Sequence, residues 1–147
     1  MHELRTEIEI DAPADVVWGV LTDFDAYPDW NPFVKKIRGE ARTGERIEVT
    51  LEQPGNKPIT FRPEVRTVEE NRAFVWFGRL GLPRIFDGEH HLEIEPLEEG
   101  RVRFVHRESF AGVLIPFMKK MIATKTRDGF VAMNAALKGR AEARARA

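Results

Sequence analysis

The clearest structural signal in the sequence is GEHHLEIEPLEEGRVRFVHRESF, residues 88–110. Apolar and polar side chains alternate on both sides of the loop Glu98-Glu99-Gly100, and this period of two is typical of β-strands. A three-residue loop whose glycine takes the left-handed conformation joins antiparallel strands. The stretch therefore predicts a β-hairpin.

The register of this hairpin brings together the side chains best suited to chemistry. It places His90 opposite Glu108 and Leu92 opposite His106. Alternation gives these four residues one common face, whereas His91 lies on the other face. The shared face is the more apolar one, so it should point into the protein.

The residues before the hairpin predict further strands and a short helix. Residues 4–10 alternate as a strand, and Pro13 with the apolar stripe after it predicts a helix over residues 13–22. Residues 23–33 hold two prolines and four aromatic side chains, which predicts a packed segment with at most a short helical turn. From residue 34 to residue 110, turn residues divide the chain into five or six strands. Their connections are too short for crossover helices, so the strands should be antiparallel.

A long amphipathic helix is predicted after the hairpin. Apolar residues recur at intervals of three and four between residues 114 and 140, and Gly129 marks an expected bend or close approach. The order of strand, helix, run of strands and long helix predicts an α+β domain with its helices on one face of an antiparallel sheet. The concave apolar space between sheet and helix is where a small ligand would bind.

Composition and charge limit the classes of protein that fit. The 147 residues suit one domain over residues 1–147, and the lack of cysteine excludes disulfide scaffolds, thiol nucleophiles and Cys-based zinc sites. A net charge of -1 argues against nucleic-acid binding. Without a membrane-spanning run or a secretory signal, we expect a cytoplasmic protein with no stable membrane insertion. The basic residues 139–147 predict a frayed helix end.

Five segments carry a family resemblance: IEIDAPADVVW at residues 8–18, LTDF at 21–24, YPDWNPF at 27–33, GEHHLEIEPL at 88–97 and RFVHRESFAG at 103–112. They resemble the START-like, or SRPBCC, superfamily and its bacterial polyketide cyclase/dehydrase-like members. The resemblance covers about residues 3–138. It implies a helix-grip fold, in which a curved seven-stranded antiparallel sheet wraps around a long C-terminal helix, with two short N-terminal helices and an apolar cavity. The superfamily includes lipid and hormone carriers and aromatase/cyclases, so the fold leaves the function open.

The candidate catalytic residues are His90, His106 and Glu108. A buried histidine beside a carboxylate is suited to general acid–base chemistry near neutral pH. The alternative that we favour is a satisfied polar pair, because structural pairs produce the same geometry. These three residues also have the ligand types of a facial metal triad, but nothing in their spacing is diagnostic of a metal. No nucleotide fingerprint is present, and no metal or cofactor is expected.

Apolar side chains on the same inner surfaces are the candidate ligand contacts, with ordinary core packing as the alternative. They are Trp30, Phe74, Trp76, Leu92, Phe104, Phe110, Met118, Met121, Ile122 and Met133.

Three functional hypotheses follow, in decreasing order of preference. The first is binding or transport of a small hydrophobic molecule such as a lipid, an isoprenoid or an aromatic compound, by a monomer or homodimer. The second is a cyclase- or dehydratase-type enzyme that acts on a polyketide-like or aromatic substrate through the His/Glu pair. The third is an accessory module that binds a partner protein.

Overall fold

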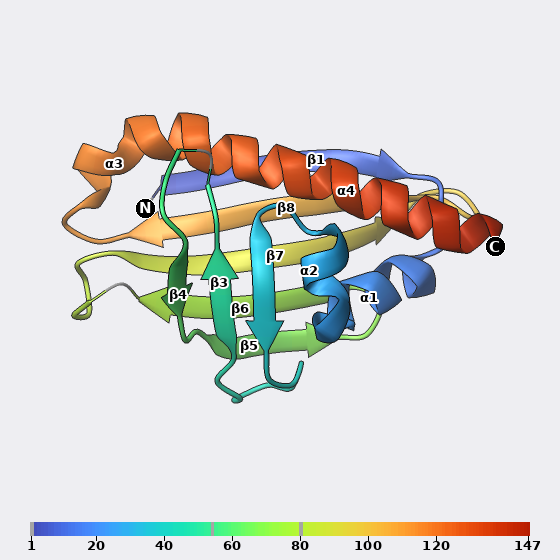
Figure 1. Cartoon of the computed structure of the whole chain (residues 1–147), viewed down its shortest axis with the longest axis horizontal. Helices are drawn as coiled ribbons and strands as arrows, with labels where there is room; N and C mark the ends of the chain where they lie inside the picture. Colours follow the sequence, from blue (N-terminus) through green and yellow to red (C-terminus); the bar gives the residue numbers. More distant parts are fainter. Residues whose placement is uncertain (1, 54, 80) are drawn as a thin grey trace.

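The computed structural model describes residues 2–53, 55–79 and 81–147, and its largest feature is a five-stranded antiparallel sheet (Figure 1). The strand order is β1-β8-β7-β6-β5. The strands are β1 (His2–Ile10), β5 (Glu64–Glu69), β6 (Ala73–Arg79), β7 (Asp87–Pro96) and β8 (Val102–Ala111). The long hairpin β7–β8 occupies the middle of the sheet, as its apolar inner face requires.

A second, three-stranded sheet corrects the expectation of one seven-stranded sheet. It comprises β2 (Val34–Arg38), β3 (Glu48–Leu51) and β4 (Ile59–Phe61), so the described chain has eight strands in two sheets. A β-bridge between Arg46 and Glu64 links it to the main sheet, together with main-chain hydrogen bonds between residues 44–47 and residues 63–65. Pro63 lies between β4 and β5, and because proline has no N–H it cannot donate to a ladder where the chain passes from one sheet to the other.

The helices agree with the sequence pattern, except that the last one is longer. Two short helices, α1 (Ala14–Thr22) and α2 (Tyr27–Trp30), follow β1, with a 3₁₀ turn between them. The C-terminal helix runs through α3 (Ile115–Met121), a π-helical segment (Ile122–Thr126) and α4 (Arg127–Arg146) without a break. Residues 139–146, where we expected fraying, are helical, and Ala141 is fully buried.

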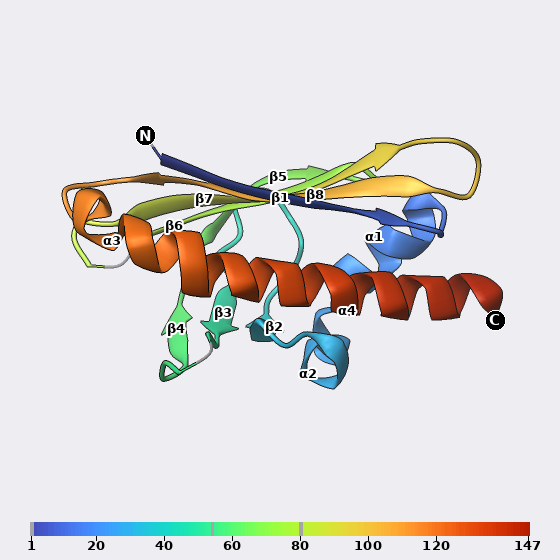
Figure 2. The same ribbon diagram turned by 90° about the horizontal axis from the view of Figure 1, so that it is seen from above.

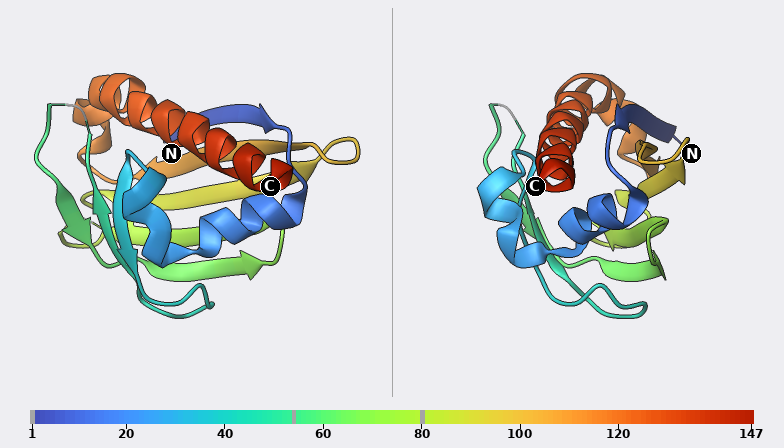
Figure 3. Two further views of the ribbon diagram at one scale, coloured as in Figure 1. Left: turned by 45° about the vertical axis from the view of Figure 1, so that its right-hand side comes forward. Right: turned by 90° about the vertical axis from the view of Figure 1, so that its right-hand side faces the viewer.

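The long helix lies in the concave space of the two sheets. Figure 2 shows α4 between the five-stranded sheet and the layer formed by α2 and β2–β4, and Figure 3 shows the sheets curving around it. The expected close approach at Gly129 is confirmed, because a Cβ atom there would lie 2.4 Å from Cδ1 of Phe33. In the described residues, no helix has both the length and the apolar character needed to cross a membrane.

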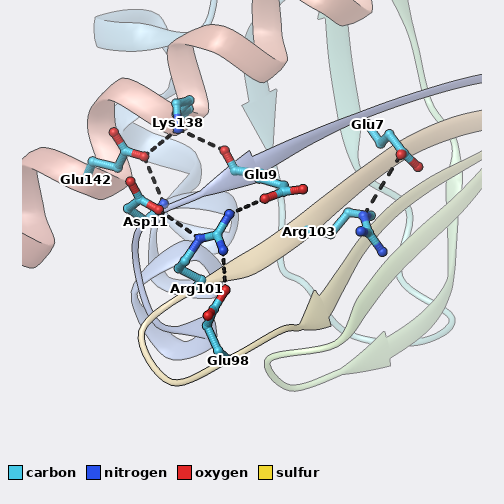
Figure 4. A network of polar contacts seen from close by, with 8 residues as sticks. All are labelled: Glu7, Glu9, Asp11, Glu98, Arg101, Arg103, Lys138 and Glu142. Atoms are coloured by element: carbon cyan, nitrogen blue, oxygen red, sulfur yellow. Dashed lines mark hydrogen bonds and ion pairs between the residues drawn. The ribbon is translucent and has the colours of Figure 1, made fainter.

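A network of exposed charges joins the hairpin tip, β1 and α4 at one end of the molecule (Figure 4). Arg101 pairs with Glu9, Asp11 and Glu98. Lys138 of α4 donates to the carbonyl oxygen of Glu9 at 2.9 Å, and a carboxylate of the same helix accepts from the main chain of Asp11. Exposed pairs of this kind each stabilise a fold by less than about 1 kcal/mol.

Candidate functional site

The predicted hairpin register is confirmed. His90 pairs with Glu108, and Leu92 pairs with His106. The loop closes through a 3.0 Å hydrogen bond from the N–H of Leu97 to the carbonyl of Arg101, and Gly100 has a φ of 78°. His90 and His106 are buried on the inner face, whereas His91 hydrogen-bonds Glu89 on the outer face.

A chain of hydrogen bonds runs from the two buried histidines to β1, and its direction can be derived. The main-chain carbonyl of His106 can only accept, so the Thr6 hydroxyl donates to it at 3.0 Å. Oγ1 of Thr6 then accepts from Nδ2 of Asn134 at 2.9 Å, which turns Oδ1 of that amide toward Nδ1 of His106 at 2.8 Å. An amide oxygen can only accept, so His106 carries its proton on Nδ1.

This direction also determines the tautomer of His90. Burial lowers the pKa of His90 to about 3, with a smaller contribution from the charge of His91. Burial, followed by the charge of His90, lowers the pKa of His106, so both rings are neutral at pH 7. Neutral His106 has a lone pair on Nε2, which accepts the Nε2 proton of His90 across 2.7 Å. The remaining lone pair of His90, on Nδ1, therefore faces Glu108.

Aromatic stacking holds the two imidazoles in place. The ring of His106 lies 3.8 Å from that of Phe130, with 7° between the planes, and His90 stacks on Trp76 at 4.6 Å. Because Phe130 belongs to α4 and Trp76 to β6, the histidines are clamped between the helix and the sheet.

Glu108 is the buried carboxyl group of the site. Its Oε1 lies 3.4 Å from Nδ1 of His90, and its side chain is 16% exposed. Burial raises the pKa of Glu108 to about 8, so the group is mostly a neutral carboxylic acid at pH 7. Gly88 makes room for it, since a Cβ atom there would lie only 2.3 Å from Oε2 of Glu108. The absence of a side chain at Gly88 therefore gives the Glu108 carboxyl group the space that it occupies.

Beside this carboxyl group lies a cavity of about 130 Å³, partly open to solvent. Four of the apolar residues predicted as ligand contacts line it together with Glu108, namely Trp76, Phe110, Met118 and Met121. Gly78 and Gly88 also line it, and because they have no side chains they leave it room.

The other predicted contacts lie elsewhere. Phe74, Leu92, Phe104, Ile122 and Met133 are almost fully buried in the packed core. Trp30 packs against Tyr27 in α2, with 5.2 Å between the ring centroids. His90 and His106 lie behind the cavity wall, where they contact Glu108 and the aromatic rings rather than open space.

The sequence reasoning missed three polar residues around the site. Asn134 stands in the apolar stripe of the helix, four residues after Phe130 and three before Leu137, which is a readable signal. Thr6 occupies an inward position of β1. Gln53 donates to Oγ1 of Thr126 at 3.1 Å in the π-helical segment, which anchors that segment to the β3–β4 connection.

The metal alternative does not match the observed donor contacts. Nε2 of His90 and Nε2 of His106 lie 2.7 Å apart and share a hydrogen bond, so neither is free to bind a metal ion. Over residues 2–53, 55–79 and 81–147, no group of three His, Asp or Glu side chains is arranged to hold a metal.

Comparison with known proteins gives one family match over residues 1–142, to the family described as polyketide cyclase / dehydrase and lipid transport. No curated protein matches the chain. Among solved structures, the Zhui aromatase/cyclase from Streptomyces sp. R1128 is 22% identical, with a TM-score of 0.80 over 99% of this chain and 96% of that one. A START superfamily protein from Mycobacterium smegmatis is 23% identical, with a TM-score of 0.75 over 97% of this chain and 99% of that one.

A third similar structure has bound small molecules. Norcoclaurine synthase from Thalictrum flavum, in complex with dopamine and hydroxybenzaldehyde, is 19% identical, with a TM-score of 0.69 over 94% of this chain and 84% of that one. At these identities the three structures establish the fold, and they confirm the expected START-like, α+β architecture.

Proposed function

We propose a function from one premise: the chain belongs to the polyketide cyclase/dehydrase and lipid transport family. On that premise the protein binds a small, mainly apolar molecule in the cavity between β6–β8, the β3–β4 sheet and the π-helical segment. The observation that carries the proposal is the cavity itself, about 130 Å³ in volume and walled largely by aromatic and thioether side chains. Such concave apolar spaces with few polar groups are where small ligands bind.

The size of the cavity restricts the ligand. A cavity of about 150 Å³ accommodates a benzene-sized molecule. The present cavity, at about 130 Å³, therefore encloses about one ring or a short branched chain. A larger ligand would extend out of the cavity on its open side. A single ring with a substituent that reaches the mouth fits better than a molecule buried whole.

The polar group of the cavity restricts the chemistry of the ligand. A carboxyl group with a pKa of about 8 is mostly uncharged at pH 7, so it is not a counter-ion for a cation. It offers one O–H donor and a carbonyl acceptor. A neutral ligand with a hydroxyl or carbonyl group satisfies Glu108, while its apolar part contacts Trp76 and Phe110.

Ligand binding can be tested directly. Native mass spectrometry of the purified protein, with organic extraction, would identify any compound that co-purifies with it. A matched pair of probes, p-cresol and toluene, would then be titrated while intrinsic tryptophan fluorescence, to which Trp76 at the cavity contributes, and the thermal midpoint are followed. We expect p-cresol to bind more tightly than toluene, and Glu108→Leu to remove that preference, with Met121→Leu as a control that keeps it. No bound compound and no response to either probe or to a wider panel would contradict the proposal.

A second candidate function is catalysis, and the protonation of Glu108 favours it. A cavity carboxylic acid whose pKa lies near neutrality is suited to general acid–base work. The hydrogen-bond chain behind it does not carry protons to solvent. Although Thr6 and Asn134 border an open groove between β1 and α4, the chain ends on an amide and a main-chain carbonyl. Glu108 would therefore act alone, with His90 and His106 as positioning residues.

The two candidates make different predictions for one variant. If the protein is an enzyme, Glu108→Gln should lower turnover of the extracted substrate by about 10²–10⁴-fold while binding persists. His90→Ala and His106→Ala should act indirectly, by changing the position and the pKa of Glu108. If the protein is a carrier, the wild-type chain binds the compound and returns it unchanged.

A further inference from the structure

Four large apolar side chains are exposed close to the cavity, on the loop before β7 and around the start of α3. Leu82 is 74% exposed, Val113 63%, Leu114 41% and Phe117 85%. An exposed cluster of this kind is unusual on a soluble surface and marks a site of contact. Phe117, the most exposed of them, lies in α3, which Figure 2 shows at one extremity of the structure.

The two segments that carry these residues are joined by main-chain hydrogen bonds. The N–H of Val113 donates to the carbonyl of Arg84 at 2.9 Å, and that of Leu114 donates to the carbonyl of Ile85 at 3.1 Å. The loop before β7 and the turn into α3 therefore form one surface. We call it the mouth face and define it as residues 81–86 and 111–127.

The mouth face carries one sign of charge. Residues 81–86 and 111–127 contain basic side chains and no acidic ones, whereas the whole chain has a net charge of -1. The basic residues are Arg84, Lys119, Lys120, Lys125 and Arg127, all of them exposed. Asp87 and Asp128 border these two ranges, and Oδ2 of Asp87 accepts a hydrogen bond from the N–H of Arg84 at 3.3 Å.

The mouth face is continuous with the cavity. Phe86, Met118 and Met121 belong to it and also line the cavity. Lys119 and Lys120 directly follow Met118 in the same helix, with Phe117 just before it. A partner that binds this face would therefore lie beside the cavity.

We propose that the mouth face docks on an anionic lipid surface, in a peripheral and reversible contact. Apolar side chains flanked by lysine and arginine, with no acidic residue among them, are the arrangement that binds headgroup regions. Phe117 and Leu82 enter the interface, while Lys119 and Lys120 contact lipid phosphates. An apolar ligand could then pass between the bilayer and the cavity without crossing water.

The test uses the full-length protein and vesicles. Co-sedimentation is measured with phosphatidylcholine vesicles and with vesicles in which about a third of the lipid is phosphatidylserine, at low and high salt. We expect binding to the anionic vesicles only, weakened by salt. Since each basic residue near such a surface contributes about fivefold in affinity, the double variant Lys119→Glu/Lys120→Glu should bind at least about 20-fold more weakly.

Matched controls separate docking from general effects of charge and folding. Lys35→Glu/Lys36→Glu reverses another adjacent, exposed lysine pair on β2 and should bind like wild type. Phe117→Ala should weaken binding about tenfold, whereas Val131→Ala, at a 50% exposed apolar position of α4, should not. Thermal midpoints confirm that each variant is folded.

Three results would overturn the proposal. They are no binding to anionic vesicles at low salt, equal binding to neutral and anionic vesicles, and equal losses from the two lysine pairs. The first of these, combined with capture of an acidic protein that needs Phe117, would assign the face to a protein partner instead. The experiment needs no cavity ligand, so its failure is distinguishable from failure of the ligand-binding proposal.

Discussion

The space between the main sheet and the long helix is packed solid at one end and hollow at the other. Toward the hairpin tip, Ile94, Phe104 and Leu137 are buried, and α1 closes the end. Toward the start of β7, Gly78, Gly88 and the methionines of α3 border the cavity. The hydrogen-bond chain of His90, His106, Asn134 and Thr6 lies between them. The same strands therefore form the packed core at one end and the wall of the cavity at the other.

This difference explains which residue types the chain uses at each end. Close packing of aromatic and branched side chains stabilises the solid end, because every lost contact there leaves a void. At the hollow end, the glycines leave the cavity unfilled because they have no side chains. The flexible methionine side chains there can change conformation to fit a bound ligand. Variants at the two ends test this difference in packing.

Truncation at the solid end should cost the most. Phe104→Ala removes a fully buried ring, and we expect the free energy of unfolding to fall by about 3–5 kcal/mol. Met118→Ala, at the cavity, should cost less than about 1.5 kcal/mol, because its side chain is only partly buried and already borders open space. Urea denaturation measures both. Equal losses would show that the two ends do not differ in packing.

The pH dependence of stability should reveal the neutral acid at the hollow end. The pKa of His90 falls from 6.5 to about 3 on folding, so unfolding takes up a proton below pH 6.5 and stability rises with pH to that point. The pKa of Glu108 rises from 4.5 to about 8, so the folded state holds the extra proton and stability falls as pH rises toward 8.

Below pH 6.5, the lowered pKa values of His90 and His106 more than offset the effect of Glu108, which places the stability maximum near pH 6.5. Between pH 6.5 and pH 8 the effect of Glu108 remains, and it lowers the free energy of unfolding by about 2 kcal/mol. Glu108→Gln should flatten this alkaline limb and steepen the acidic limb between about pH 4.5 and pH 6.5, where the titration of Glu108 opposes that of the histidines. An alkaline limb that survives in this variant would mean that Glu108 is ionised in the folded protein.

Removing the middle of the hydrogen-bond chain should cost about 1–3 kcal/mol. Asn134→Ala leaves the Nδ1 proton of His106 and one lone pair of the Thr6 hydroxyl without partners. Nitrogen NMR of the histidines should then show His106 losing its single Nδ1-protonated tautomer. Thr6→Ser keeps the hydroxyl and serves as the control. If Asn134→Ala leaves the tautomer unchanged, the derived direction of the chain is wrong.

The charged network at the solid end should matter least. Arg101→Ala removes three exposed ion pairs, and we expect the smallest loss of stability among these variants, which shrinks further in high salt. Thermal denaturation at two salt concentrations measures it. A loss as large as that of Phe104→Ala would mean that charge, rather than packing, holds this end together.

Local pattern was sufficient to predict the hairpin and its register. Alternation assigns a face to each residue, and the loop Glu98-Glu99-Gly100 determines which residues pair, so His90 opposite Glu108 followed from neighbouring residues alone. The stripe of the last helix was equally readable, because its period of three to four is local. The resemblance in residues 8–33 and 88–112 predicted the fold that the family match over residues 1–142 confirms.

Tertiary structure decided where along the strands the space lies. Alternation shows that Phe104 and Phe110 both point inward, but only the position of α3 and of the second sheet makes one of them core and the other cavity wall. It also decided the partners of the histidines, since Asn134 and Thr6 come from a helix and a strand distant in sequence. A side chain's face is a local property of its backbone, whereas its neighbours and its solvent depend on how separate elements meet.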